Sequence, residues 1–196
     1  MKSDKFAIPE FATEYDFKRI RNKLNMSQQE FALFIGTSKP TVERWEKQGS
    51  KVTGPVVLLI NMIENNIDYV EKLKIPEKKY PTRLFYMMDN HICTIIDVDD
   101  LKQKVSIINY TNNLMFRAFG KIENPSYKEY EEFLKSRCFP ETRDKLKLVL
   151  ENLGVPFYDP FLIIKKTEGR MAEDNFWIKI EEWLNWSNYL NKIQLQ

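Results

Sequence analysis

The segment from Met26 to Lys47 constrains the fold of this chain most, because it predicts two short helices joined by a sharp turn. Ser27 stands three residues before Glu30, the spacing of a capping box in which each residue bonds the backbone N–H of the other. Apolar side chains then recur on one helical face until Gly36, which can adopt the positive φ that a tight turn needs. The first helix is therefore expected to bury one side and to end at Gly36.

A second short helix follows the turn, with a clear division between inner and outer residues. Ser38 is placed to cap it, and Pro40 falls in the first turn, where a missing N–H costs nothing. Val42 and Trp45 are three residues apart and are expected to point inward together. The residues left on the outer face are polar and partly basic: Lys39, Thr41, Glu43 and Arg44.

Two helices in this layout are typical of a helix-turn-helix, in which the second helix enters the major groove of DNA. The opening Ser-Gln-Gln-Glu-Phe-Ala, the Gly-Thr-Ser turn and the Val-Glu-Arg-Trp-Glu end resemble the Xre/Cro/C1 repressor family over residues 13–66. The Trp-Glu and Gly-Pro details are most similar to antitoxin-type members. The resemblance implies that double-stranded DNA is the partner, contacted by Gln28, Gln29, Ser38, Lys39, Pro40, Thr41, Arg44, Lys47 and Lys51.

The resemblance also implies a role for several of these positions. Gln28 would contact a phosphate, and Lys51, after the loop that contains Gly49, would approach the backbone. Lys39, Pro40 and Arg44 would read bases, with Ser38 and Thr41 near the backbone. Since Pro40 has no polar side chain, it can make only an apolar contact, for example with a thymine methyl group, and Arg44 is the residue expected to read a guanine. The alternative is a stable helical bundle that binds protein and never touches DNA.

Composition and charge support two folded parts. The chain is 43% hydrophobic and 13% aromatic, which excludes a disordered chain. Residues 1–80 carry 14 basic and 11 acidic side chains, against 16 and 17 in residues 81–196. The excess of positive charge thus coincides with the helix-turn-helix. Two cysteines, no apolar leader and no long apolar stretch lead us to expect a soluble, cytoplasmic protein.

We predict an α+β chain with three parts. Residues 1–74 form the helix-turn-helix domain, whose first helix, 14–25, should turn four cations outward: Lys18, Arg19, Arg21 and Lys23. Residues 75–81 form a linker bracketed by Pro76 and Pro81. Residues 82–196 form a domain that dimerises or binds a partner.

Within this last domain, segments 83–88, 91–98 and 104–110 predict a three-stranded antiparallel meander. Helices are expected at 126–137, at 141–153 and from Asp159 to before Gly169. The tail from Asn175 is amphipathic and rich in tryptophan, and pairs either with the body of the domain or with a second copy of the chain.

Candidate chemistry in the second domain reduces to three groups. His91 and Cys93 could share a strand face and activate a thiol, but two residues of a half-buried sheet are the more ordinary interpretation. Asp97, Asp99 and Asp100 are more typical of a turn than of a cation site. We therefore predict no enzyme activity, no cofactor and no metal.

The third group is Arg137, Arg143 and Asp174, which could form a buried arginine–carboxylate framework or simply satisfy helix ends. The surrounding pattern is similar to a small module found near HipA-like kinases, which implies a toxin–antitoxin or mobile-element setting.

Two functions remain open from the sequence. In the first, the chain is a repressor or autorepressor that binds a palindromic operator as a homodimer, with Trp177, Trp183 and Trp186 offering interface surface. In the second, it is an antitoxin or a phage or mobile-element inhibitor. Residues 82–196 then bind a toxin or another protein, and the helix-turn-helix regulates its own operon.

Overall fold

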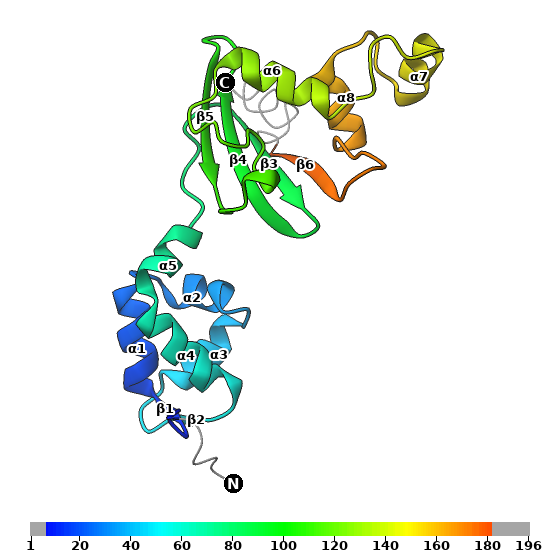
Figure 1. Cartoon of the computed structure of the whole chain (residues 1–196). Coiled ribbons are helices and arrows are strands. Elements are labelled where there is room, and N and C mark those ends of the chain that lie inside the picture. Colours follow the sequence, from blue (N-terminus) through cyan, green and yellow to red (C-terminus); the bar gives the residue numbers. More distant parts are fainter. Residues whose placement is uncertain (1–6, 182–196) are drawn as a thin grey trace, which may run out of the picture. The chain divides into compact units, whose positions relative to one another are not determined.

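The computed structural model describes residues 7–181, and the chain divides into two compact units, Met1–Ile75 and Pro76–Gln196 (Figure 1). Unit 1 is helical and unit 2 is a sheet covered by helices, which confirms the predicted α+β class. No helix among the described residues is long and apolar enough to span a membrane.

Unit 1 packs its helices around one apolar core. Phe17 and Ile20 of the first helix and Leu24 at its C-terminal end are fully buried, and Phe31 and Val42 join them from the next two helices. Burying a side chain of this size contributes roughly 1.5–3 kcal/mol, so these contacts dominate the stability of the unit. The elements are β1 (Ala12–Thr13), α1 (Glu14–Lys23), α2 (Gln28–Phe34), α3 (Lys39–Trp45), β2 (Lys51–Val52), α4 (Pro55–Asn65) and α5 (Ile67–Leu73).

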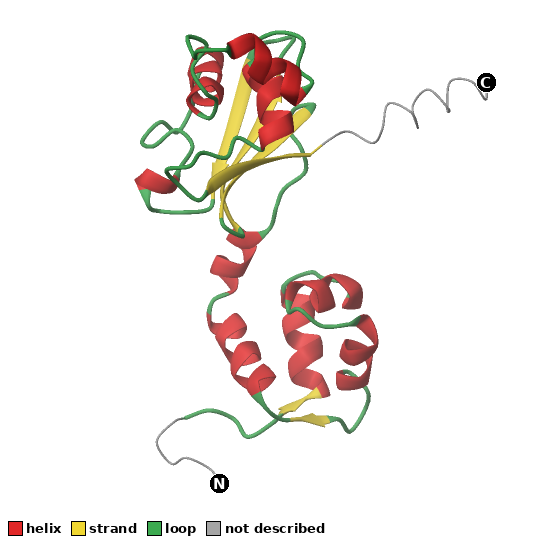
Figure 2. Cartoon of the chain, turned by 90° about the vertical axis from the view of Figure 1, so that its right-hand side faces the viewer, coloured by secondary structure: helices red, strands yellow, loops and turns green. Residues whose placement is uncertain are grey.

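Unit 2 is a four-stranded antiparallel sheet in the order β5-β4-β3-β6. Helices pack against it (Figure 2), and Tyr130, Phe133 and Ile163 are among the helical side chains that complete its core. The elements are β3 (Thr82–Met88), β4 (His91–Asp99), β5 (Lys104–Asn109), η1 (Leu114–Phe116), α6 (Tyr127–Ser136), α7 (Leu146–Leu153), α8 (Pro160–Thr167) and β6 (Phe176–Glu181).

The fourth strand corrects the predicted three-stranded meander. Residues 176–181, expected to belong to an amphipathic tail, pair with β3 so that Ile178 lies opposite Tyr86. Their alternation is that of a strand, because Phe176, Ile178 and Ile180 all pack on the core. Trp183 and Trp186 lie outside the described residues.

The second predicted helix of this unit begins later than expected. Arg143 donates its backbone N–H to the carbonyl of Pro140 in a turn, and Lys145 takes a left-handed conformation with φ of 55°. An L-residue with positive φ cannot continue a right-handed helix, so α7 begins at Leu146 rather than at residue 141.

A buried ion pair joins β3 to β4 and holds the start of unit 2. Arg83 bonds both oxygens of Asp97, at 2.6 and 2.8 Å, and these two residues face each other in the register of the strands. The same guanidinium donates to the carbonyls of Pro76 and Glu77, and Asp97 accepts from the backbone of Lys79. Residues 76–79, part of the segment predicted as a linker, are therefore attached to unit 2.

Candidate nucleic-acid interface

The inner face of α3 is fixed by two side chains. Val42 is fully buried, and the ring of Trp45 stacks on Phe17 of α1 with centroids 4.9 Å apart. Gly36, with φ of 70°, makes the turn that brings α3 out of α2. Because the buried residues set the rotation of α3, its polar face is directed to solvent, as the sequence predicts.

The two helix starts differ from one another. At α2, Ser27 accepts from the N–H of Glu30 and Glu30 accepts from the N–H of Ser27, which confirms the predicted capping box. At α3, Ser38 occupies the capping position, but its hydroxyl pairs with the Thr41 hydroxyl at 2.9 Å and caps no backbone N–H. The reason is local: Pro40 has no N–H, and the N–H of Thr41 already bonds the Ser38 carbonyl.

A partly buried cluster connects the three helices below this surface. Arg21, expected to face solvent, instead bonds both carboxylate oxygens of Glu46, at 2.6 and 3.1 Å, just after the end of α3. Gln28 donates its amide N–H₂ to the same carboxylate at 2.8 Å. An amide carries two N–H donors, so Gln28 retains one for a phosphate and is held in place by the other. The sequence analysis missed this cluster, because the pairing of a buried Glu with an Arg on another helix is visible only in three dimensions.

Glu46 remains ionised at neutral pH because of this cluster. Burial on its own raises the pKa of Glu46, but the hydrogen bonds from Arg21 and Gln28, with the positive charge of Arg21, lower that pKa overall. The cluster therefore ties the start of α2 to the end of α3 and keeps the two helices in register with one another.

Lys51 is positioned by a feature that the sequence analysis did not find. It lies in β2, which pairs with β1 so that Thr13 is opposite Lys51, and its ammonium is 4.8 Å from the centre of the Phe11 ring. This short pairing fixes the loop after α3 to the start of α1. The Lys51 side chain is exposed, as a phosphate contact requires.

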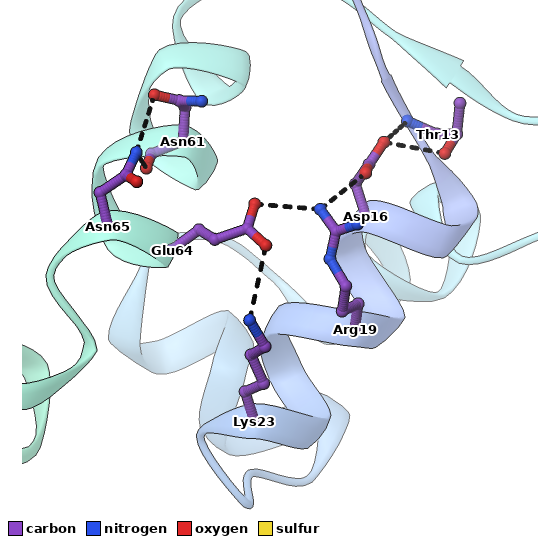
Figure 3. Close-up of polar contacts among 7 residues, drawn as sticks. All are labelled: Thr13, Asp16, Arg19, Lys23, Asn61, Glu64 and Asn65. Carbon is purple, nitrogen blue, oxygen red and sulfur yellow. Dashed lines mark hydrogen bonds and ion pairs between the residues drawn. The ribbon is translucent and has the colours of Figure 1, made fainter.

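The cations of unit 1 fall into two groups. On α1, Arg19 pairs with Asp16 at 3.1 Å and with Glu64 of α4 at 3.0 Å, and Lys23 pairs with Glu64 at 3.6 Å (Figure 3). Lys39 pairs with Glu43 one turn along α3, at 3.4 Å. By contrast, Arg44, Lys47 and Lys51 form no ion pair with any residue in the described part of the chain, and the same holds for Lys18 and Lys72. Of these five cations, Arg44, Lys47 and Lys51 are predicted DNA contacts.

The structure gathers most of the nine predicted positions. Ser38, Lys39, Pro40, Thr41 and Arg44 lie on α3 or at its first turn, and all but the half-buried Thr41 are exposed. Gln29 is exposed at the start of α2, and Gln28 is close enough to bond Glu46 after α3. Such an exposed polar helix with unpaired cations at its end can bond base edges and phosphates.

Residues 17–61, from α1 into α4, match the family described as Helix-turn-helix. Unit 1 contains a helix-turn-helix domain. This confirms the Xre/Cro/C1 resemblance for the N-terminal part of the chain. No curated protein and no solved structure matches the chain, and the similarity of unit 2 to a module near HipA-like kinases has no support.

The candidate residues of unit 2 do not form a reactive site around His91 and Cys93. A register shift between Tyr86 and Met87 interrupts the pairing there, and it leaves His91 exposed while Cys93 is buried in the core. Burial raises the pKa of the Cys93 thiol, so it stays protonated. The two groups thus do not act as a base and an activated thiol.

The aspartates and arginines of unit 2 mostly have partners. Asp97 pairs with Arg83, Asp99 with Lys102, and Asp100 accepts from the Tyr127 hydroxyl. No group of three His, Cys, Asp or Glu side chains in the described residues could hold a metal ion.

Arg137 forms half of the predicted arginine framework. It bonds both oxygens of Asp174, at 2.6 and 3.0 Å, and the carbonyls of Gly169 and Phe176. Its hydrogen bonds lower the pKa of Asp174. Arg143 does not join this group, since its guanidinium is 5.5 Å from the ring centre of Phe139. The framework ties the end of α6 to the turn before β6.

Proposed function

We propose that this chain is a sequence-specific DNA-binding transcriptional regulator that inserts α3 into the major groove. The helix-turn-helix match supports a DNA-binding regulator of the Xre family. The observation that carries the finer proposal is the exposed face of α3, where Arg44 is turned to solvent without an acidic partner among the described residues. Most cations elsewhere in the domain are neutralised by neighbouring carboxylates, so Arg44 is the side chain best prepared to bond a guanine.

The test is a binding-site selection with the intact chain, its Arg44→Ala variant and a matched control, Arg19→Ala. Losing a base-reading arginine should cost about 1–3 kcal/mol on the selected site and relax the preference at one base pair. Arg19→Ala removes the same charge from α1, where it is held by Asp16 and Glu64 (Figure 3), and should leave the preference unchanged. Equal preferences for all three proteins would remove Arg44 from the reading role.

We further propose that the regulator acts as a homodimer on a palindromic operator, with the interface in residues 82–196. A single recognition helix reads only a few base pairs, whereas a two-fold pair doubles the contacts. Of the tryptophans expected to supply interface surface, Trp177 is used inside unit 2: its indole N–H donates to the carbonyl of Asp89 at 2.6 Å, and Arg170 lies over its ring. Sedimentation at micromolar concentration should give a dimer, and a monomer would exclude this proposal.

A further inference from the structure

A pocket of about 430 Å³ opens in unit 2 between α6 and the start of α8, which pack side by side (Figure 1). Three carboxylates line it from three elements: Asp100 from the turn after β4, Glu131 from α6 and Asp159 at the start of α8. One cation, Lys135, also lines it, so negative charge exceeds positive charge. None of these groups belongs to the arginine framework or to the DNA-binding face.

The carboxylates are only partly satisfied by their neighbours. Asp100 accepts from the Tyr127 hydroxyl at 3.1 Å, and Asp159 accepts from the backbone N–H of Leu162 at 2.8 Å. Glu131 forms no ion pair or hydrogen bond with any residue that the structure describes. A carboxylate offers about four acceptor sites, so each of the three can accept further N–H donors.

The hydroxyl of an almost fully buried tyrosine opens into the same space. Tyr130 is only 2% exposed, yet it lines the pocket, and its hydroxyl has no hydrogen-bond partner between residues 7 and 181. Burial raises the pKa of Tyr130, and the negative charges of Asp100, Asp159 and Glu131 raise it further. The phenol therefore stays protonated and lies close to all three carboxylates. No side-chain N or O atom in the described residues is both fully buried and without a partner, so the Tyr130 oxygen is the part of this residue that remains accessible, and a ligand in the pocket can bond it.

The remaining walls of the pocket are aromatic and apolar. The rings of Tyr127 and Tyr130 lie 5.7 Å apart at 49°, and Phe161 adds a third ring. Leu134 and Leu162 supply aliphatic surface. Aromatic faces attract cations, most strongly where carboxylates lie nearby and water is scarce. Because no three acidic side chains in the described residues are grouped tightly enough to hold a metal ion, this lining suits an organic cation.

We propose that this pocket binds an alkylammonium or guanidinium group attached to an apolar stem. The charged head would donate N–H bonds to Glu131, Asp100 and the Tyr130 oxygen, and the stem would lie against Leu134 and Leu162. The group could belong to a free amine or to a lysine or arginine side chain of another protein. The proposal does not depend on DNA binding by unit 1.

The experiment is a titration of the ¹⁵N-labelled intact chain with N-acetyl-lysine methylamide, followed by amide chemical shifts. N-acetyl-norleucine methylamide, which has a similar stem and no charge, is the ligand control. Only the lysine compound should give saturable shifts in α6, the start of α8 and the turn at Asp100. A parallel titration with 1,4-diaminobutane separates the two sources: tighter binding of the diamine favours a free amine, and tighter binding of the capped lysine favours a protein side chain.

Three variants make the assignment specific. Glu131→Gln and Tyr130→Phe should each weaken binding about three- to tenfold, the range of one charged contact for the first and of one hydrogen bond for the second. Glu132→Gln removes a neighbouring charge that pairs with Lys128 on α6 outside the pocket, and should leave binding unchanged. Tyr130→Phe removes a hydroxyl without a described partner, so thermal unfolding should not shift downward.

The proposal fails if neither amine gives saturable shifts in these elements. It also fails if the norleucine compound binds as well as the lysine compound, or if Glu131→Gln and Glu132→Gln behave alike. A drop in the unfolding temperature of Tyr130→Phe would show that the hydroxyl has a structural partner, and would overturn its role as the vacant donor and acceptor.

Discussion

Arg21–Glu46 in unit 1 and Arg83–Asp97 in unit 2 are both arginine–carboxylate pairs with two hydrogen bonds, and they stabilise different kinds of structure. In unit 1, Arg21 and Glu46 have side chains that are 18% and 3% exposed and connect helix ends. In unit 2, Arg83 and Asp97 are 4% and 5% exposed and face each other across two strands. The first pair lies next to the exposed polar face of α3, and the second lies inside a sheet.

This comparison indicates what a buried ion pair specifies in a helical unit and what it specifies in a sheet. Helices α1 and α3 could slide slightly and still pack apolar faces, so the Arg21–Glu46 pair selects one arrangement of α3 against α1. A strand that slips by one residue turns every side chain to the other face. Since such a slip would place Arg83 opposite Ile96 or Val98, the Arg83–Asp97 pair selects the register of β3 against β4.

The largest expected effect comes from breaking the pair in unit 2. Asp97→Ala leaves Arg83 buried without its carboxylate, which should lower the free energy of unfolding of unit 2 by about 3–5 kcal/mol. Hydrogen exchange resolved by residue should show the loss in unit 2 and no change in unit 1. Asp99→Ala, on the same strand but paired with the exposed Lys102, is the control and should cost about 1 kcal/mol or less. An equal loss in both units would show that they unfold together.

The Arg21–Glu46 pair should contribute somewhat less to the free energy of unfolding, and its contribution should depend on pH. Arg21→Ala leaves the Glu46 carboxylate buried and should cost about 3 kcal/mol at pH 7. Because the folded pKa of Glu46 is lowered, its stabilising contribution is present above the ordinary glutamate pKa of about 4.3 and is lost as the pH falls through the folded value.

Acid titration of unfolding tests this dependence. The intact chain should lose stability in unit 1 more steeply below about pH 4.3 than Arg21→Ala does. Lys39→Ala, which removes a cation whose side chain is 49% exposed and whose partner Glu43 is equally exposed, serves as the control and should follow the intact chain. Parallel acid curves for all three proteins would contradict a protective role for the pair.

Lys51→Ala tests whether Lys51 contacts the DNA backbone or reads a base. If Lys51 contacts one phosphate, its removal should weaken all sites equally and reduce the slope of log K against log salt by about 0.9. Fluorescence titrations at several salt concentrations measure this slope. A loss confined to one sequence would instead make Lys51 a reading residue.

The smallest expected effects are on the stability of the N-terminal ends of α2 and α3. Ser27→Ala removes a capping hydroxyl and should cost about 1 kcal/mol, whereas Ser38→Ala, which loses only a bond to Thr41, should cost a few tenths of that. Urea unfolding of the two variants side by side gives the comparison. A larger loss for Ser38→Ala would mean that the hydroxyl pair at α3 carries more stability than a cap.

Sequence reasoning succeeded where the cause is local. The capping box at Ser27, the turn at Gly36 and the inward side of α3 depend on residues within a few positions of one another, and all appear in the structure. It was less successful for β6. The alternation of Phe176, Ile178 and Ile180 was available, but the tryptophans between and after them favoured an amphipathic tail.

The sequence by itself determined that a helix-turn-helix lies near the start, that a sheet-containing unit follows, and which side chains of α3 face solvent. Only the tertiary structure decided that Arg21 turns inward to Glu46, 25 residues away, that β6 completes the sheet beside β3, and that Tyr130 faces three carboxylates. The physical reason is the range of the interactions. Caps, turns and periodicity are set by neighbouring residues, whereas ion pairs, strand partners and pockets depend on which distant residues the core brings together.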